Sequence, residues 1–443
     1  MVELTVRCTM KKYFLIFFLL TIFVCYADEA NCNSDSICDW AAGRVDSRIS
    51  LDVEKMGLSL PSAKTTSYQL IKRYMPSLLK NAYLSIVMDS SHRLGDYLAR
   101  GEIDLSDLNV IMDSGEQKSP IFSQDLRSVI LFHSVATRDI AKFFVKHEVS
   151  RLPQGKAVSS VGKSYTGILI DARGKLPIHG EYVNDELVPC IFPKVWDTNM
   201  DLLYEKNMVS PENLMKRNIV VYSDTLDETS YSDIIGVEPL RIIARGIFGQ
   251  NRTDPIISVQ DSAKLLSRKE NLRLLEEGRV VILCNKELLK VASSSESPDE
   301  DFYFAYHEIE KVIDERKAKG IEPSKGKNII KFTVYDIKFV ADEADILPEE
   351  TGRLDTIVEA LLKVAGDAHF LIEGHTADLN RPEDQLELSI KRAERIAEEL
   401  VKRGIDANRI QTTGYGSTRP IAPSDTSENR AKNRRVEITI MKD

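Results

Sequence analysis

A short polar loop, His375–Pro382, and the segment that follows it hold the side chains best suited to chemistry. The loop is rich in Thr, Asp, Asn, Arg and Pro, which favour turns. Arg392 follows, at the rim of an apolar stripe with helical spacing. A guanidinium can bind a carboxylate through two parallel hydrogen bonds. Several Glu residues also surround Arg392, and a charged side chain on such a helix is usually solvated surface.

These side chains need a strand before the loop and a helix after it. Phe370–Glu373 is a short apolar run that ends at Gly374, which predicts a buried strand. Apolar residues then recur with helical spacing as far as Leu400. The acidic pair Glu383 and Asp384 suits the positive end of a helix dipole. The loop is therefore expected to connect the end of a buried strand to the start of an amphipathic helix.

The sequence shows no pattern typical of an enzyme or a metal site. His375 is interpreted as a structural histidine, because no second metal ligand follows it at the usual spacing. The chain contains no GxSxG, HExxH, Walker or dinucleotide-binding motif. We therefore expect no catalytic residues, no metal and no cofactor. An enzyme built from residues distant in sequence is recognised only by geometry, so this alternative stays open here.

Several motifs around the loop occur together in one known family. They are FxxDEAxIL at Phe339–Leu347, GHT at Gly374–Thr376, LSxxRAxxI at Leu388–Ile396, and NRRVEI at Asn433–Ile438. In order and spacing they resemble the OmpA-like C-terminal domain family, whose members bind peptidoglycan. The resemblance covers roughly residues 328–442 and implies an α/β sandwich, in which helices pack on one face of a mixed sheet. The overall arrangement is similar to spirochaetal envelope proteins that carry such a C-terminal domain.

The resemblance implies a binding site for the diamino acid of the peptidoglycan stem peptide. Arg392 matches the family's Arg, which binds the carboxylate of this ligand. The family's Asp after GHT binds the ammonium, but this chain has Ala377 there and a carboxylate one place later, at Asp378. The residues implied as ligand-binding are Arg392, Asp378, Thr376 of the GHT motif, Gln385 where the family has Asn, and Arg435 of the NRR motif.

Ala377 leaves two interpretations open. A shift of one residue can move a carboxylate by about 3.5 Å, more than a hydrogen bond tolerates. In the first interpretation the loop re-registers, Asp378 takes the ammonium, and the domain tethers the envelope to the wall non-covalently. In the second, the fold persists as an interaction scaffold that has lost peptidoglycan. For Arg434 and Arg435, salt bridges with nearby carboxylates are an equally good explanation.

The N-terminus predicts export. Residues 1–27 read as a signal region, with the basic pair Lys11 and Lys12 before the apolar run Tyr13–Val24 and cleavage after Ala27. The alternative is a lipoprotein signal with Cys25 as the lipidated residue. We expect a periplasmic or outer-membrane-associated envelope protein, with peptidoglycan and other envelope proteins as partners. A net charge of −9 argues against nucleic acid.

Export changes how the cysteines are interpreted. Cys32 and Cys38 are close enough in sequence to close a small disulfide loop in an oxidising compartment. Cys190 and Cys284 are expected either to pair or to be buried thiols. No CxxC pair occurs, which argues against zinc.

At 443 residues and 43% hydrophobic, the chain can form several cores, so we expect an α+β multidomain protein. The expected parts are a helix-rich mixed domain at 28–150, a β-rich domain at 151–291, a linker and spacer helix at 292–326, and the OmpA-like domain at 327–443. Tyr83–Met88 is predicted to be a strand, and Ser258–Glu277 a single helix.

Overall fold

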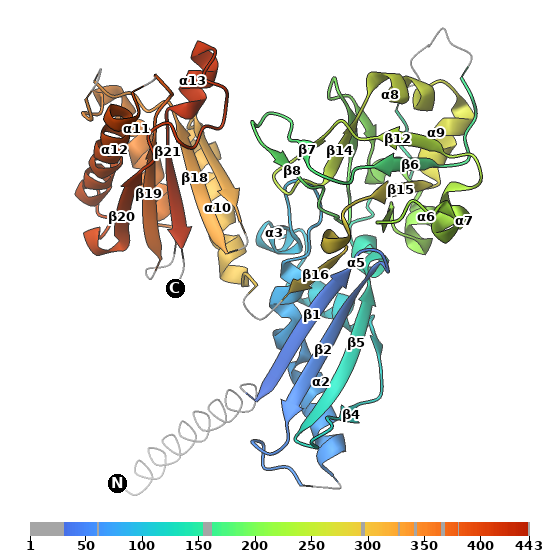
Figure 1. The fold of residues 1–443 in the computed structure, drawn as a ribbon. Helices are drawn as coiled ribbons and strands as arrows, with labels where there is room; N and C mark the ends of the chain where they lie inside the picture. The colour runs from blue at the N-terminus through green and yellow to red at the C-terminus, as the bar shows by residue number, and fades with distance from the viewer. Residues whose placement is uncertain are drawn as a thin grey trace, which may run out of the picture.

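The structure, a computed structural model, describes residues 31–59, 62–153, 162–293, 297–326, 328–340, 343–364, 368–379 and 381–441. The expected signal region and Cys25 lie outside the described residues. Figure 1 shows three parts, in which the C-terminal and middle parts stand beside each other above the N-terminal sheet. No helix within the described ranges combines the length and apolarity that crossing a bilayer requires.

The N-terminal part is an antiparallel sheet covered by a long helix. Its strands run in the order β16-β1-β2-β5-β3, and β4 also pairs with β5. The helix α2 packs through buried Ile71, Met75 and Leu79. The elements are β1 (Cys32–Asp39), β2 (Arg44–Asp52), α2 (Ala63–Leu84), α3 (Leu94–Ala99), α4 (Leu105–Asp113), β3 (Glu116–Gln117), β4 (Ile121–Phe122), β5 (Ser128–Ala136), α5 (Thr137–Lys142) and β16 (Lys290–Ser293).

Two sequence predictions for this part are wrong. Tyr83 and its neighbour end α2 rather than begin a strand, because they continue the buried face of the helix that contains Met75. Cys32 and Cys38 lie on one strand, where six residues of extended chain separate their Cα atoms by about 20 Å. A disulfide tolerates at most about 7 Å. These two cysteines are therefore not joined to each other, and both are buried, as are Cys190 and Cys284.

The middle part contains two four-stranded sheets flanked by short helices. One sheet is entirely parallel in the order β11-β15-β6-β12, and the other has the order β10-β9-β14-β13. The elements are β6 (Ile168–Asp171), β7 (Leu176–Pro177), β8 (Asn184–Asp185), β9 (Val195–Asp197), β10 (Leu202–Tyr204), α6 (Pro211–Lys216), β11 (Val221–Ser223), α7 (Ser232–Ile235), β12 (Leu240–Ile243), β13 (Gly246–Phe248), β14 (Asp254–Ile257), α8 (Val259–Leu266), α9 (Lys269–Glu276) and β15 (Val280–Leu283).

The helix predicted at Ser258–Glu277 is two helices. Ser258 caps α8 by accepting a hydrogen bond from the Asp261 N–H. The first helix then ends at Leu266, where the Asn271 side chain donates 3.0 Å hydrogen bonds to the carbonyls of Lys163 and Lys264. A buried amide therefore satisfies a carbonyl that a continuous helix would have used.

The C-terminal part is the α/β sandwich that the resemblance implied. Its mixed sheet has the order β17-β18-β21-β19-β20, with β19 and β20 parallel and the other neighbours antiparallel. Phe332, Phe370 and Ile438 face the helices and are fully buried. The elements are α10 (Glu300–Arg316), β17 (Ile321–Lys325), β18 (Ile329–Tyr335), α11 (Thr351–Leu361), β19 (His369–His375), α12 (Pro382–Lys402), β20 (Ile410–Gly414), α13 (Ser427–Asn433) and β21 (Arg435–Met441).

The segment expected to be a linker and spacer helix belongs largely to the sheets and cores. Its start lies in β16, which pairs with β1 and returns the chain to the first sheet. Helix α10 buries Tyr306, Ile309 and Val312 in the C-terminal core. Strand β17 is the edge strand of the C-terminal sheet. The apolar face of α10 packs against the sandwich, so this helix is part of a core rather than a spacer.

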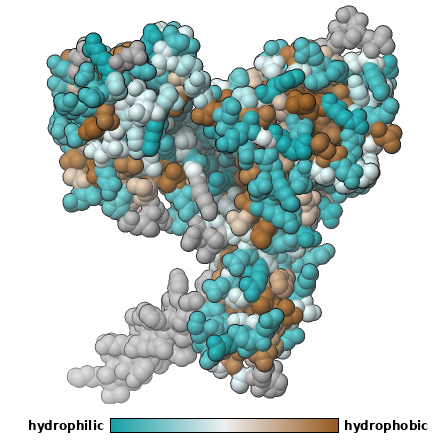
Figure 2. Space-filling model, viewed as in Figure 1, coloured by the Kyte–Doolittle hydropathy of each residue, from teal (hydrophilic) through white to brown (hydrophobic). Residues whose placement is uncertain are grey.

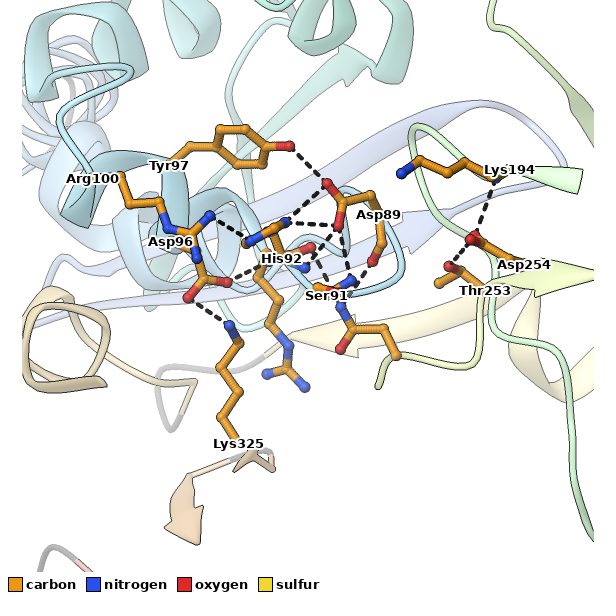
Figure 3. A network of polar contacts seen from close by, with 12 residues as sticks. Asp89, Ser91, His92, Asp96, Tyr97, Arg100, Lys194, Thr253, Asp254 and Lys325 are labelled. Carbon is orange, nitrogen blue, oxygen red and sulfur yellow. Dashed lines mark hydrogen bonds and ion pairs between the residues drawn. The ribbon is translucent and has the colours of Figure 1, made fainter. Parts of the chain in front are cut away.

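A polar network joins the three parts (Figure 3). Asp96 of α3 forms a 2.7 Å ion pair with Lys325 of β17, and these side chains are only 4% and 2% exposed. Arg100 donates to Glu310 of α10 at 3.0 Å and contacts the His92 ring at 2.6 Å. The segment from Ile86 to Arg100 thus connects the N-terminal part to both elements that open the C-terminal part.

The same segment also binds the middle part. The Asn251 side chain donates to the Asp89 carbonyl at 2.9 Å, and its backbone N–H donates to the Ser90 carbonyl. Asp89 is held in turn by the His92 ring and by the Tyr97 hydroxyl, at 2.9 and 2.7 Å. Burial raises the pKa of Asp89, but these hydrogen bonds outweigh it and hold the pKa well below its usual range. The carboxylate is therefore a fixed anion at the junction.

Candidate functional site

The candidate site lies where strands β18, β19 and β21 meet the helix α12. Gly374, near the end of β19, approaches α12 so closely that a Cβ there would clash with the Ser389 carbonyl. This close packing brings α12 beside the ends of the strands. A narrow pocket opens at this point, lined by Ile337, Phe339, Gly374, His375, Arg392, Arg434, Arg435 and Val436.

Arg392 enters this pocket from α12. Its guanidinium carbon lies 4.6 Å from the centre of the Phe339 ring, and its Nε donates to the Glu343 carbonyl at 3.4 Å. Both partners belong to the FxxDEAxIL segment, far from Arg392 in sequence. A guanidinium stacked on an aromatic face has a fixed plane. The side chain is half-buried, so it is oriented without being sealed from solvent.

Arg435 reaches the same pocket from β21 and is only 4% exposed. Its Nε donates to Glu437 at 2.7 Å and its Nη2 donates to the Arg419 carbonyl at 3.1 Å. The remaining nitrogen, Nη1, is buried and has no hydrogen-bond partner among the described residues. A buried charged donor without an acceptor is costly. Nη1 is therefore the one nitrogen of this guanidinium whose hydrogen-bonding capacity the described residues do not meet.

Glu437 compensates the charge of Arg435. It also pairs with Lys331 of β18, and its carboxylate is mostly buried. Burial raises the pKa of Glu437, but the hydrogen bond from Lys331 and the charge of Arg435 outweigh it and lower the pKa to about 2. Both arginines of the NRR motif thus form salt bridges. Arg435 pairs with Glu437, and Arg434 pairs with Asp336 at 3.0 Å.

His375 closes the base of the pocket. Its ring stacks on Tyr415 at 5.5 Å, and both ring nitrogens are buried without a hydrogen bond among the described residues. Burial and the neighbouring charge of Arg435 lower the pKa of His375 to about 4, so the ring is neutral at pH 7. Within the described ranges, no group of His, Cys, Asp and Glu side chains has the arrangement of a metal site.

Thr376 and Gln385 lie in the base of the loop rather than in the pocket lining. The Thr376 N–H donates to the Gly416 carbonyl at 2.9 Å. The Gln385 side chain donates to the Ala377 carbonyl at 2.9 Å and accepts from the Ser417 hydroxyl at 3.0 Å. These bonds tie the loop to the end of β20. Both residues are buried and hold the loop in place.

The loop separates Asp378 from the other expected residues. Ala377, at the family's Asp position, faces the interior and is only 4% exposed. Asp378 is exposed, and its N–H lies 3.4 Å from the Ser424 hydroxyl. It does not line the pocket that contains Arg392. The structure thus brings Arg392 and Arg435 together and leaves Asp378 outside.

The sequence analysis missed the partners Phe339 and Glu437, although both lie inside the quoted motifs. Alternate residues of a strand share one face. Glu437, two places after Arg435, could therefore have been predicted to lie beside it. The contact between Phe339 and Arg392 had no comparable signal, because it joins residues from separate elements.

Comparison with known proteins decides the family of this part of the chain. Residues 338–434 match the OmpA family. They form an OmpA-family domain. Residues 31–143 match the N-terminal domain of Treponema pallidum Tp0624, and residues 167–286 match the second domain of that protein. The three matches follow one another along the chain and fall in its three structural parts.

Individual relatives share the OmpA-family domain. The peptidoglycan-binding protein ArfA of Mycobacterium tuberculosis is 39% identical over 104 residues, which cover 24% of this chain and 32% of ArfA. The probable lipoprotein YiaD of Escherichia coli is 34% identical over 131 residues, covering 29% of this chain and 59% of YiaD. The chain thus spans about a third of the length of ArfA.

Solved structures show the same partial similarity. An outer membrane protein from Borrelia burgdorferi is 37% identical, and the alignment covers 27% of this chain and 96% of that protein with a TM-score of 0.23. The periplasmic domain of Helicobacter pylori MotB (residues 90–256) is 29% identical, with coverage of 29% and 83% and a TM-score of 0.27.

Proposed function

We propose that this chain is an exported, non-enzymatic envelope protein whose OmpA-family domain binds peptidoglycan non-covalently. Arg392 and Arg435 would bind the carboxylate of the stem-peptide diamino acid. The observation that carries the proposal is the buried Arg435 Nη1, which lacks an acceptor in a pocket that Arg392 also lines. A ligand carboxylate would satisfy this donor.

The pocket favours a carboxylate over a cation. Arg392, Arg434 and Arg435 all line it, so three guanidinium groups come together around one small space. Stacking on Phe339 fixes the plane of the Arg392 guanidinium, so little side-chain entropy is lost when a carboxylate binds. The similarity to ArfA, whose name describes peptidoglycan binding, supports the same ligand.

A second candidate is an envelope scaffold that keeps the fold without the wall. The observation that favours it is the pair of buried Ala377 and exposed Asp378. Without a carboxylate at the interior position, the ligand's ammonium loses its expected acceptor. This candidate places the protein in the same compartment, the periplasm or the inner side of the outer membrane, and gives it protein partners instead of peptidoglycan.

Co-sedimentation with purified sacculi of native wall chemistry tests the proposal. The chain from residue 28 onward should pellet with the sacculi, and Arg392→Ala should weaken binding about tenfold or more, because a charge-assisted hydrogen bond is lost. Arg395→Ala is a matched control, since this Arg of α12 pairs with Glu398 and lies outside the pocket. Circular dichroism checks that each variant is folded.

The outcomes separate the two candidates. Loss of binding in Arg392→Ala but not in Arg395→Ala supports wall binding at the pocket. Loss in Asp378→Ala as well would mean that the loop re-registers to use the shifted carboxylate. A wild-type chain that stays in the supernatant would overturn wall binding and favour the scaffold.

A further inference from the structure

A second and much larger cavity lies beside the candidate site. It has a volume of about 980 Å³ and is walled by all three parts of the chain. Arg100 comes from the N-terminal part, Tyr182 and Arg252 from the middle part, and Glu322 and Tyr335 from the C-terminal sheet. Figure 2 shows the recess between the middle and C-terminal parts. A cavity of this size can hold a ligand larger than one amino acid.

The cavity adjoins the pocket that contains Arg392. Arg435 lines the pocket and Glu437 lines the cavity, and these alternate residues of β21 are joined by a 2.7 Å hydrogen bond. The two spaces therefore lie on either side of a single ion pair. A stem peptide of about three residues reaches on the order of 10 Å from its diamino acid to the sugar that carries it. This reach allows the sugar chain attached to a peptide bound at Arg392 to enter this cavity.

The walls of the cavity combine an exposed aromatic ring with polar groups of both charges. Tyr182, in the turn between β7 and β8, is 59% exposed although it is aromatic. Beside it, His179 packs edge-to-face on Phe248 at 6.0 Å, which extends the aromatic surface. Aromatic faces provide apolar contact area to flat ligands. Tyr182 is thus placed to pack against a ring that enters the cavity.

Charge in the cavity argues against a highly charged polymer. The charged residues that line it are Arg100, Arg252, Lys325 and Lys432 together with Glu181, Glu310, Asp314, Glu322 and Glu437. A polyanion or a polycation would meet several like charges. A neutral chain with many hydroxyl and amide groups can instead use both the donors and the acceptors.

The walls are fixed in position before any ligand binds. Arg252 pairs with Glu181 through two hydrogen bonds of 2.7 and 2.8 Å, and Arg100 pairs with Glu310. The buried pair of Asp96 and Lys325 holds the N-terminal part against β17, as Figure 3 shows. Fixed walls lower the entropic cost of binding.

We infer that this cavity binds the glycan strand of peptidoglycan, a neutral polymer of N-acetylated sugars, while the stem peptide occupies the pocket of Arg392. The inference deepens the proposed function and rests on it. Tyr182 packs against a sugar ring from the middle part, and Glu322 accepts hydrogen bonds from sugar hydroxyl or amide groups on the C-terminal side.

A peptide-free sugar tests this inference separately from wall binding. The chain from residue 28 onward is titrated by calorimetry with a hexamer of β-1,4-linked N-acetylglucosamine. Saturable binding is expected, weakened about tenfold by Tyr182→Ala and by Glu322→Ala, which lie on opposite walls. Phe132→Ala is the control, since this ring is 37% exposed on β5 outside the cavity. It should bind the hexamer as the wild type does.

The hexamer titration distinguishes the glycan inference from wall binding through the stem peptide. No binding of the hexamer, or binding that neither Tyr182→Ala nor Glu322→Ala weakens, overturns the glycan inference even where sacculi are retained through Arg392. Retention of peptide-bearing wall fragments alone would mean that the chain recognises the stem peptide without the glycan, which also overturns it. Hexamer binding that depends on Tyr182, together with sacculus retention that Arg392→Ala leaves unchanged, would support the cavity as a glycan site and count against the stem-peptide pocket.

Discussion

Buried charge sets the candidate site apart from the rest of the C-terminal sheet. Lys331, Glu437 and Arg435 form a chain of ion pairs on the face of the sheet opposite the helices. His375 adds a neutral imidazole 3.9 Å from Glu437. Each charge in this group lies beside an opposite charge. Arg435 Nη1 is a hydrogen-bond donor in the group that has no acceptor among the described residues. The chemistry of the site therefore depends on which of these groups carries a proton.

Acid should destabilise the fold through His375. Its folded pKa of about 4 lies below the value of about 6.5 in an unfolded chain, so the unfolded state binds more protons between these pH values. Stability is fully present above pH 6.5 and falls by on the order of 3 kcal/mol as pH drops to 4. Urea unfolding followed by circular dichroism across this range measures it, and His375→Gln should flatten the curve.

Glu437 contributes in a lower pH window. Its folded pKa of about 2 lies below the unfolded value, so its contribution is present above about pH 4.5 and is lost as pH falls towards 2. The two groups are thus separable by pH. An unfolding curve of His375→Gln that still falls as steeply between pH 6.5 and 4 would assign the titration to another group.

Restoring the family's carboxylate should strengthen wall binding. Ala377→Asp places an acceptor at the interior position of the loop, and one charge-assisted hydrogen bond to the ligand ammonium would raise retention on sacculi about tenfold. The unliganded variant should lose roughly 1–3 kcal/mol of stability, because an unpaired carboxylate becomes buried. Ala377→Asn, of similar size but uncharged, is the matched control. Equal retention of both variants would show that no ammonium binds at this position.

At the scale of elements, the site depends on the close approach of β19 and α12. Gly374 allows this approach, because the strand backbone lies against the carbonyl of Ser389. The same packing places His375 at the base of the pocket and Arg392 at its side. The pocket therefore exists only while the strand and the helix remain in contact.

Adding a methyl group at this contact should separate the two elements. Gly374→Ala should lower the unfolding free energy by about 1–3 kcal/mol, as overpacking does, and should weaken sacculus binding. Gly352→Ala is the control, because this glycine of α11 has open space around it and gains helix propensity of about 0.8–1 kcal/mol at most. Thermal unfolding compares the variants. If Gly374→Ala melts as high as Gly352→Ala, the close contact does not constrain the fold.

At the scale of the molecule, the segment that contains α3 sets the position of the three parts. It contacts the middle part through Asn251, the helix α10 through Arg100 and the strand β17 through Asp96. The large cavity lies between parts that this segment connects. Its shape therefore depends on contacts remote from its own lining.

Breaking the buried ion pair should release the C-terminal part. Lys325→Ala leaves Asp96 buried without its partner, which costs about 3–5 kcal/mol. We expect a larger radius of gyration by small-angle X-ray scattering. Lys311→Ala, on the exposed side of α10, should leave the radius unchanged. Asp96→Asn combined with Lys325→Met should restore most of the compactness, and an unaltered radius in Lys325→Ala would refute the role of this pair.

Local pattern and motif spacing determined much of the C-terminal domain from the sequence alone. The strands β18, β19 and β21 and the helices α11 and α12 follow from the pattern of their apolar residues. The motifs identified Arg392 and placed Arg435 near it. These features depend on residues that lie close together in the chain. They can therefore be predicted from one sequence without a structure.

Only the tertiary structure decided the features that join distant segments. It placed Phe339 under Arg392, packed α10 and β17 into the C-terminal core, and separated Cys32 from Cys38 along one strand. It also turned Ala377 inward and left Asp378 exposed. Periodicity reports which face of an element is buried but not which element covers it. Packing between elements decides which partners a polar residue has and how deeply it is buried. Such packing joins segments that are distant in the chain, so a local sequence pattern does not reveal it.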